Sequence, residues 1–157
     1  MILTTHALVG AAIGSEIKNP WIIIPVVLVI HYFLDSFRHG EYIDDRKDGV
    51  KSAWWKIIID LSIGFSIIFS FIHLNGSDLK IISNILIGTF FSMFPDLLTL
   101  LHWKFKNNKT LRKIKKIHSF AHRYTKFPKY SPERQWTLRN AVNDILVSIL
   151  AIFILFI

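Results

Sequence analysis

Long apolar runs separated by short polar stretches dominate this chain, and they predict five hydrophobic helices. The predicted helices cover residues 2–17, 21–37, 53–74, 79–103 and 136–157. KNP at 18–20 separates the first two, because proline cannot continue a helix, and the turn sequence NGSD at 75–78 separates the third from the fourth. With 157 residues, the chain should form a single all-α domain, residues 1–157.

Length and composition place these helices in a membrane. A spanning helix needs about 20 apolar residues, and the runs at 53–74, 79–103 and 136–157 reach that length. Hydrophobic residues make up 52% of the chain and the mean hydropathy is +0.40, which is too apolar for a small soluble domain. We therefore predict an integral membrane bundle of about five hydrophobic helices. Whether helix 2–17 crosses fully is left open, because its length of about 24 Å falls short of a bilayer.

The charge distribution predicts the orientation of the bundle. The formal net charge is +8, and 12 of the 19 Lys and Arg residues lie between Lys104 and Arg139. The positive-inside rule places the basic amphipathic segment 104–135 at the cytoplasmic face, so the expected location is the inner, cytoplasmic membrane, crossed several times. A nucleic-acid partner is not expected, because no recognised binding module accompanies the charge. The residues expected to bind anionic lipid or another anion are Lys113, Lys115, Lys116 and Arg123.

The sequence HYFLDSFRHGEY at 31–42 carries the first candidate chemistry. His31, Asp35 and His39 are spaced four residues apart, so they would share one face of a helix. His118 and His122 repeat this spacing in the basic segment. On the topology set by Lys and Arg, six of the seven histidines reach the cytoplasmic leaflet. The histidines of distant segments are therefore expected to lie at one end of the bundle.

These residues indicate a metal site beneath the inner lipid surface. The chain has no cysteine, so a transition metal has to be held by histidine and carboxylate ligands, a set that suits Zn²⁺, with Mn or Fe as alternatives. Carboxylates at membrane depth are costly, and a shared cation would supply their partner. The predicted metal ligands are His6, His31, Asp35, His39, Asp96, His118 and His122, and the candidate general bases are Asp60 and Asp35.

Each candidate also has a purely structural interpretation, and these interpretations stay open at the level of the sequence. His31 could bond to a backbone carbonyl, Asp35 and Asp96 could cap helix ends, and His39 could belong to a charged loop. Asp60 could pair with Lys56, and Asp144 could pair with Arg139 or bond within the bundle. His118 and His122 could belong to an amphipathic surface helix, and His102 could be an interfacial residue.

Four short stretches resemble a known family: TTHALVGAAIG at 4–14, HYFLDSFRHGEY at 31–42, FPD at 94–96 and IHSFAH at 117–122. They are similar to elements of small bacterial membrane proteins related to the membrane-bound metal-dependent hydrolase-like family. The helix with H-x-x-x-D-x-x-x-H is more distantly similar to the all-helical zinc-dependent phospholipase C and S1/P1 nuclease fold. The resemblance implies metal roles for His6, His31, Asp35 and Asp96, and also for His39, His118 and His122.

Two functions from different classes are compatible with these features. The first is a metal-dependent hydrolase at the cytoplasmic membrane face, where a bound divalent ion activates water and polarises a phosphoester or lipid-type substrate. The second is a non-catalytic membrane protein, whose polar residues hold a structural metal or join the helices, and whose basic segment docks on anionic lipid or a partner. A site with open access would favour the first function, and a closed site would favour the second.

Overall fold

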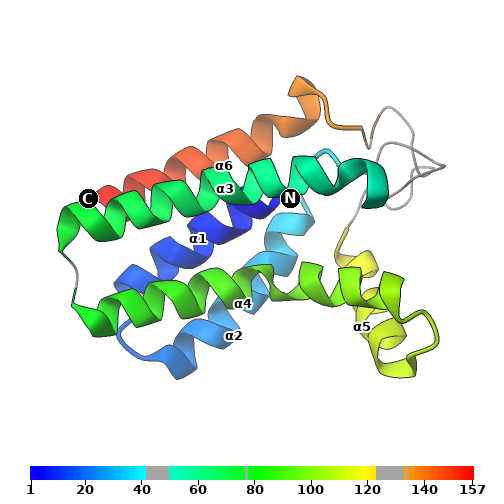
Figure 1. Ribbon diagram of the computed structural model, residues 1–157, viewed down its shortest axis with the longest axis horizontal. Coiled ribbons are helices and arrows are strands. Elements are labelled where there is room, and N and C mark those ends of the chain that lie inside the picture. The colour runs from blue at the N-terminus through cyan, green and yellow to red at the C-terminus, as the bar shows by residue number, and fades with distance from the viewer. Residues whose placement is uncertain (42–49, 77, 123–132, 134) are drawn as a thin grey trace.

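The computed structural model describes residues 1–41, 50–76, 78–122, 133 and 135–157, and within these residues the chain is built from helices (Figure 1). An isolated parallel bridge between Glu41 and Gln135 joins the segment after the second helix to the segment before the last. The predicted all-α class is confirmed. The helices are α1 (Leu3–Glu16), α2 (Pro20–Asp35), α3 (Val50–Asn75), α4 (Leu79–Lys104), α5 (Lys109–Ala121) and α6 (Leu138–Phe156).

Three of the described helices are long and apolar enough to cross a membrane, rather than the predicted five. They are the 22 residues Trp54–Asn75 within α3, the 26 residues of α4 and the 19 residues of α6. The prediction was too high because α1 has only 14 residues and α2 only 16, so they extend about 21 and 24 Å against a hydrocarbon thickness of about 30 Å. The chain is therefore a membrane protein in which two short helices accompany three long ones.

The outer surface of the long helices is apolar, which is what lipid contact requires. Exposed side chains include Ile63 and Phe69 on α3 and Leu146, Ile149 and Phe153 on α6. A helix on the surface of a soluble protein would turn charged and polar residues outward instead. The exposed faces therefore agree with the apolar length of α3, α4 and α6.

Helix α1 occupies the middle of the bundle and contacts α2, α3, α4 and α6 (Figure 1). Its approach to α4 is close because glycines face each other. A Cβ added to Gly10 would lie 2.3 Å from the Gly88 carbonyl oxygen, and one added to Gly14 would lie 2.4 Å from the Asn84 carbonyl oxygen. Small residues at these positions bring the two backbones together.

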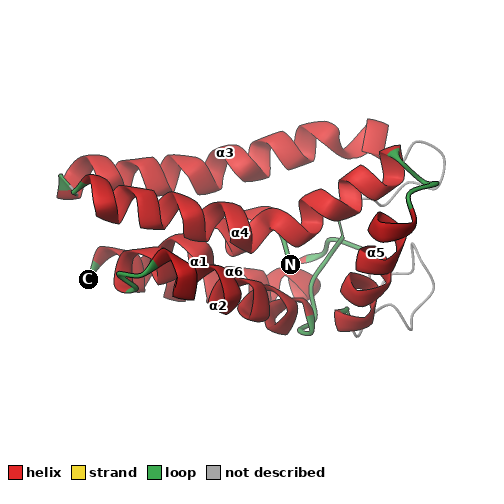
Figure 2. Ribbon diagram, turned by 90° about the horizontal axis from the view of Figure 1, so that it is seen from below, coloured by secondary structure: helices red, strands yellow, loops and turns green. Residues whose placement is uncertain are grey.

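Helix α5 has a different direction from the long helices. It follows α4 after a short turn and runs across one end of the bundle, as the second view shows (Figure 2). The turn between α3 and α4 lies at the opposite end (Figure 1). The first residues of α1 and the last residues of α2 lie toward the end where α5 packs, which brings the predicted ligand residues to one region.

Candidate metal centre

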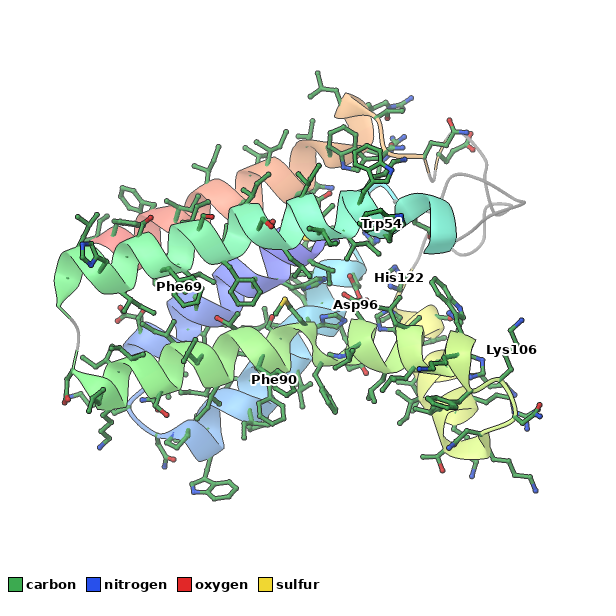
Figure 3. The ribbon with its side chains drawn as sticks, viewed as in Figure 1. Trp54, Phe69, Phe90, Asp96, Lys106 and His122 are labelled. Atoms are coloured by element: carbon green, nitrogen blue, oxygen red, sulfur yellow. The ribbon has the colours of Figure 1, made fainter. Side chains whose placement is uncertain are left out.

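The seven predicted ligand residues come from four helices and meet at the α5 end of the bundle. Two labelled members, Asp96 and His122, lie near one another there (Figure 3). All seven side chains are buried or half-buried. His6 comes from the first turn of α1, His31 and Asp35 from the end of α2, His39 from the segment after α2, Asp96 from α4, His118 from α5, and His122 from the residue that ends α5.

Asp35 lies at the centre of this group. Its Oδ1 is 3.1 Å from His6 Nε2 and 2.5 Å from the Met1 nitrogen. Its Oδ2 is 3.0 Å from His31 Nε2, 3.2 Å from His122 Nε2 and 3.8 Å from His118 Nε2. One buried carboxylate is therefore surrounded by four imidazole nitrogens, all of them Nε2.

Asp96 extends the group along α4. Its Oδ1 is 3.3 Å from His118 Nε2, and its Oδ2 is 4.0 Å from His6 Nε2. Helix α4 continues through Pro95 without interruption, so Asp96 does not cap a restarted helix as one interpretation of the sequence had it. The carboxylate instead faces two of the four nitrogens that surround Asp35, those of His6 and His118.

The spacing of these atoms fits ligands around a shared cation. Four ligands about 2.1 Å from Zn²⁺ in a tetrahedron lie about 3.4 Å from one another. His31 Nε2 and Asp35 Oδ2 are 3.0 Å apart, yet neither atom has a hydrogen-bond partner among the described residues. Both atoms are buried, and buried polar atoms without partners are costly. A cation between them would remove that cost.

In His31 and His39, Nδ1 is hydrogen-bonded to a backbone carbonyl, which leaves Nε2 for the group. His31 Nδ1 lies 2.7 Å from the Ser92 carbonyl oxygen, and His39 Nδ1 lies 2.9 Å from the Phe37 carbonyl oxygen. A carbonyl accepts only from N–H, so each Nδ1 carries a proton, and in the neutral ring Nε2 then keeps its lone pair. Metal-binding histidines are commonly oriented by such hydrogen bonds. The carbonyl bond considered for His31 therefore exists, and it is compatible with a ligand role.

Two overlapping sets of atoms could hold a metal ion. In each set the ligand atoms lie within 4.8 Å of one another, and Asp35 belongs to both. Burial holds the pKa of the His39 imidazole well below its usual range, which keeps the ring in the neutral form that binds metals. The first set is His31, Asp35, Asp96 and His118, and the second is Asp35, His39 and His122.

The group is closed on most sides and open on one edge. The side chains of His6 and His31 are 0% exposed, that of Asp35 is 1% exposed and that of His118 is 5% exposed. The side chain of Asp96 is 23% exposed and that of His122 is 16% exposed. A water molecule or a substrate would therefore reach the group past Asp96 and His122.

Two further carboxylates, Asp60 and Asp144, are engaged at the beginning of α1. Asp60 Oδ2 accepts a hydrogen bond from the Thr4 amide at 3.2 Å, and the Asp60 carbonyl accepts one from the Thr4 hydroxyl. Asp144 Oδ1 accepts from the Ile2 amide at 2.9 Å. Ile2 precedes α1 and provides no side-chain cap. The two carboxylates therefore accept from amides at the beginning of α1. A bond of Asp144 within the bundle was one interpretation of the sequence, whereas the contact of Asp60 with Thr4 was not predicted. That Asp60 is a general base stays a prediction.

Other partners of the site were also absent from the predictions. The Ser92 carbonyl is a backbone group, so no residue type at that position could have signalled its role. Arg38 donates from Nε to Asn140 Oδ1 at 2.6 Å, and Asn143 Nδ2 donates to the Arg38 carbonyl at 2.7 Å. These bonds attach the segment that carries His39 to α6.

The predicted anion-binding residues differ in exposure, and their anion-binding role stays a prediction. Lys113 and Lys116 are exposed on α5, whereas Lys115 is half-buried with its Nζ 5.1 Å from the centre of the Trp103 ring. Arg123 lies outside the described residues. His102 is half-buried in the last turn of α4.

No family model, no curated protein and no solved structure gives a significant match to this chain. The resemblance to metal-dependent hydrolases therefore stays a prediction from short motifs. What the chain does has to be argued from the geometry of the His and Asp residues themselves.

Proposed function

We propose that this protein binds a divalent transition metal, with Zn²⁺ as the first candidate, and uses it to hydrolyse a phosphoester or lipid-type substrate at the inner face of the cytoplasmic membrane. The main support for the proposal is that four imidazole Nε2 atoms lie 3.0 to 3.8 Å from the carboxylate oxygens of Asp35. Nitrogen and oxygen ligands of this kind suit Zn²⁺, and Mn or Fe are alternatives.

The charge of the buried group supports a cation. Asp35 and Asp96 bring two carboxylates together, and Asp35 is almost fully buried. Isolated buried charges are costly unless they are paired or bind a metal. The Met1 ammonium pairs with Asp35 Oδ1 at 2.5 Å and offsets one of these two negative charges. A neutral imidazole provides a lone pair but no further charge. A divalent ion would balance the carboxylates and accept the lone pairs at the same time.

The open edge supports chemistry at this site. A bound divalent ion would supply Lewis acidity and would lower the pKa of a water molecule. Asp96 and His122 form the part of the group that solvent reaches, so a substrate would meet these side chains first. Asp35 and Asp60 are the predicted bases. Of the two, Asp35 lies among the imidazoles, whereas Asp60 binds Thr4.

A structural metal site or polar network is the second candidate. It is favoured by the burial of His6, His31 and Asp35, whose side chains are 0 to 1% exposed. A closed site with all positions filled by the protein stabilises a fold and leaves no place for a substrate. In that case the protein would bind metal without hydrolytic activity.

Metal content of the detergent-purified full chain tests the first part of the proposal. The double variant His31→Ala/Asp35→Ala should lose the bound metal, because both residues belong to the first ligand set. A matched control is His73→Ala/Asp78→Ala, which removes one histidine and one aspartate from exposed positions near the turn between α3 and α4. Equal metal content in wild type and in the His31/Asp35 variant would exclude the metal centre.

Hydrolysis is tested separately. The metal-loaded protein should cleave chromogenic phosphoesters or phospholipids in mixed micelles, and activity should disappear with a chelator and return with Zn²⁺. Activity that persists in His31→Ala/Asp35→Ala would point to a contaminating enzyme. Stoichiometric metal without hydrolysis of either substrate class would favour the structural role.

A further inference from the structure

The outward face of α5 is a surface that the metal centre does not use. The helix has a defined beginning at Asn108, whose side chain accepts hydrogen bonds from the Thr110 and Leu111 amides at 3.0 and 3.1 Å. It runs across the end of the bundle (Figure 2). With α3, α4 and α6 crossing a bilayer, a helix in this direction lies along the membrane surface.

The two faces of α5 differ sharply. His118 is buried on the inward face, with Leu111 and Ile114 half-buried on the same side. At about 100° per residue, the exposed side chains surround the position opposite His118. They are Lys109, Arg112, Lys113, Lys116, Ile117 and Phe120.

The composition of the outward face fits anionic lipid. It carries four cations, and the chain from Lys104 to His122 contains no Asp or Glu. Phe120 is 90% exposed and Ile117 is 61% exposed. Exposed apolar residues flanked by Lys and Arg are typical of helices whose apolar groups enter the headgroup boundary while their cations contact phosphates. Each cation near an anionic surface contributes about fivefold to binding.

We propose that the outward face of α5 docks on anionic lipid headgroups and that this docking increases the metal affinity of the centre. The coupling rests on the metal centre proposed above. His118 lies in α5 and His122 is the residue that ends it. Their Nε2 atoms lie 3.8 and 3.2 Å from Asp35 Oδ2. Because α5 packs mainly on α4, lipid on its outer side would hold both imidazoles against Asp35.

Docking is measured on the full chain in nanodiscs. The chain has no cysteine, so Thr110→Cys gives a unique site on α5 for an environment-sensitive dye. Phosphatidylcholine nanodiscs with phosphatidylglycerol should allow a headgroup nitroxide to quench the dye strongly, and phosphatidylcholine alone should not. Lys113→Glu/Lys116→Glu should weaken docking by at least about 25-fold and abolish the response. The matched control Lys18→Glu/Lys80→Glu makes the same charge change at exposed positions at the opposite end of the bundle and should keep the response.

The coupling is measured as Zn²⁺ affinity, by competition with a chelator in the same nanodiscs. Affinity should be about 10-fold higher with phosphatidylglycerol, and Lys113→Glu/Lys116→Glu should remove this difference. Quenching that does not depend on phosphatidylglycerol or on the two lysines would overturn docking. Lipid-dependent quenching with equal Zn²⁺ affinity in both lipids would overturn the coupling alone. Lipid-dependent quenching without Zn²⁺ binding in either lipid would exclude the metal centre, and the coupling with it, while supporting docking.

Discussion

The contact between α1 and α4 should control both the stability of the bundle and the metal centre, and Gly10→Ala tests this. The added Cβ would lie 2.3 Å from the Gly88 carbonyl oxygen and 2.7 Å from Ser92 Cβ. Because real Cβ contacts essentially never fall below 3.0 Å, the two backbones would have to separate by about 0.7 Å. Neither neighbouring atom is the end of a flexible side chain, so the helices themselves must move.

Gly10→Ala is expected to lower both the free energy of unfolding and the Zn²⁺ affinity. Overpacking of this kind costs about 1–3 kcal/mol of unfolding free energy, against which the higher helix propensity of alanine returns at most about 1 kcal/mol. The separation also moves α1, which carries His6 one turn before Gly10, away from α4, which carries Asp96 and the Ser92 carbonyl. Altered ligand positions should lower Zn²⁺ affinity by about 10- to 100-fold. Thermal unfolding in detergent and chelator competition measure the two effects.

Gly64→Ala is the graded control for this experiment. Its Cβ would lie 3.3 Å from the nearest atoms, Thr4 Cα and Oγ1, so a shift of a few tenths of an ångström accommodates it. Gly64→Ala should therefore keep near wild-type stability and metal affinity. If Gly10→Ala also keeps both, α1 and α4 do not approach as closely as described and the geometric argument for the centre fails.

Three further predictions concern the carboxylates and the metal. Asp144→Ala should lower the unfolding free energy by about 1–3 kcal/mol, because the Ile2 amide loses its acceptor. Asp144→Asn keeps an acceptor and should cost less. Equal losses of unfolding free energy for the two variants in a denaturation series would contradict this. Asp35→Asn should reduce bound metal more than Asp96→Asn does, since Asp35 faces four imidazoles and Asp96 faces two; elemental analysis compares them. Chelation should lower the unfolding temperature of the wild type but not of His31→Ala/Asp35→Ala, because a ligand stabilises only the state that binds it; equal shifts would show that the metal binds elsewhere.

Spacing within one helix was readable from the sequence because it is a local property. His31 and Asp35 are four residues apart on α2, and they lie 3.0 Å from each other. The charge distribution then added a long-range expectation, that distant segments place their histidines at one end of the bundle. The structure brings His6 and His118 to the same carboxylate, which confirms that expectation for these residues.

The number of spanning helices was overestimated because apolar character and length are separate requirements. Helix α2 is apolar throughout most of its 16 residues, yet it is too short to cross fully. The particular partners of Asp60 and Asp144 escaped prediction for a different reason. Their partners, Thr4 and Ile2, are more than 50 residues away in the chain, and a backbone amide looks the same in every sequence. Only the packing of α3 and α6 around α1 shows these contacts.

The buried position of α1 explains why a membrane protein carries so many polar residues in its apolar helices. The first residues of this 14-residue helix are buried, and its first amides and last carbonyls need partners. Asp60 and Asp144 serve the first amides, and Asn84 Nδ2 donates to the carbonyls of Ile17 and Lys18 at 3.0 and 3.2 Å. Each of these three polar residues therefore has a partner at or beside an end of α1. Asp144 Oδ2, like His31 Nε2 and Asp35 Oδ2, is buried without a hydrogen-bond partner among the described residues. Asp35 differs from Asp144 because four imidazole Nε2 atoms lie 3.0 to 3.8 Å from its carboxylate oxygens. Imidazole nitrogens gathered around carboxylates are the arrangement that holds a divalent cation, which is why the metal centre, and not the polar character of the bundle in general, is the feature to which we assign function.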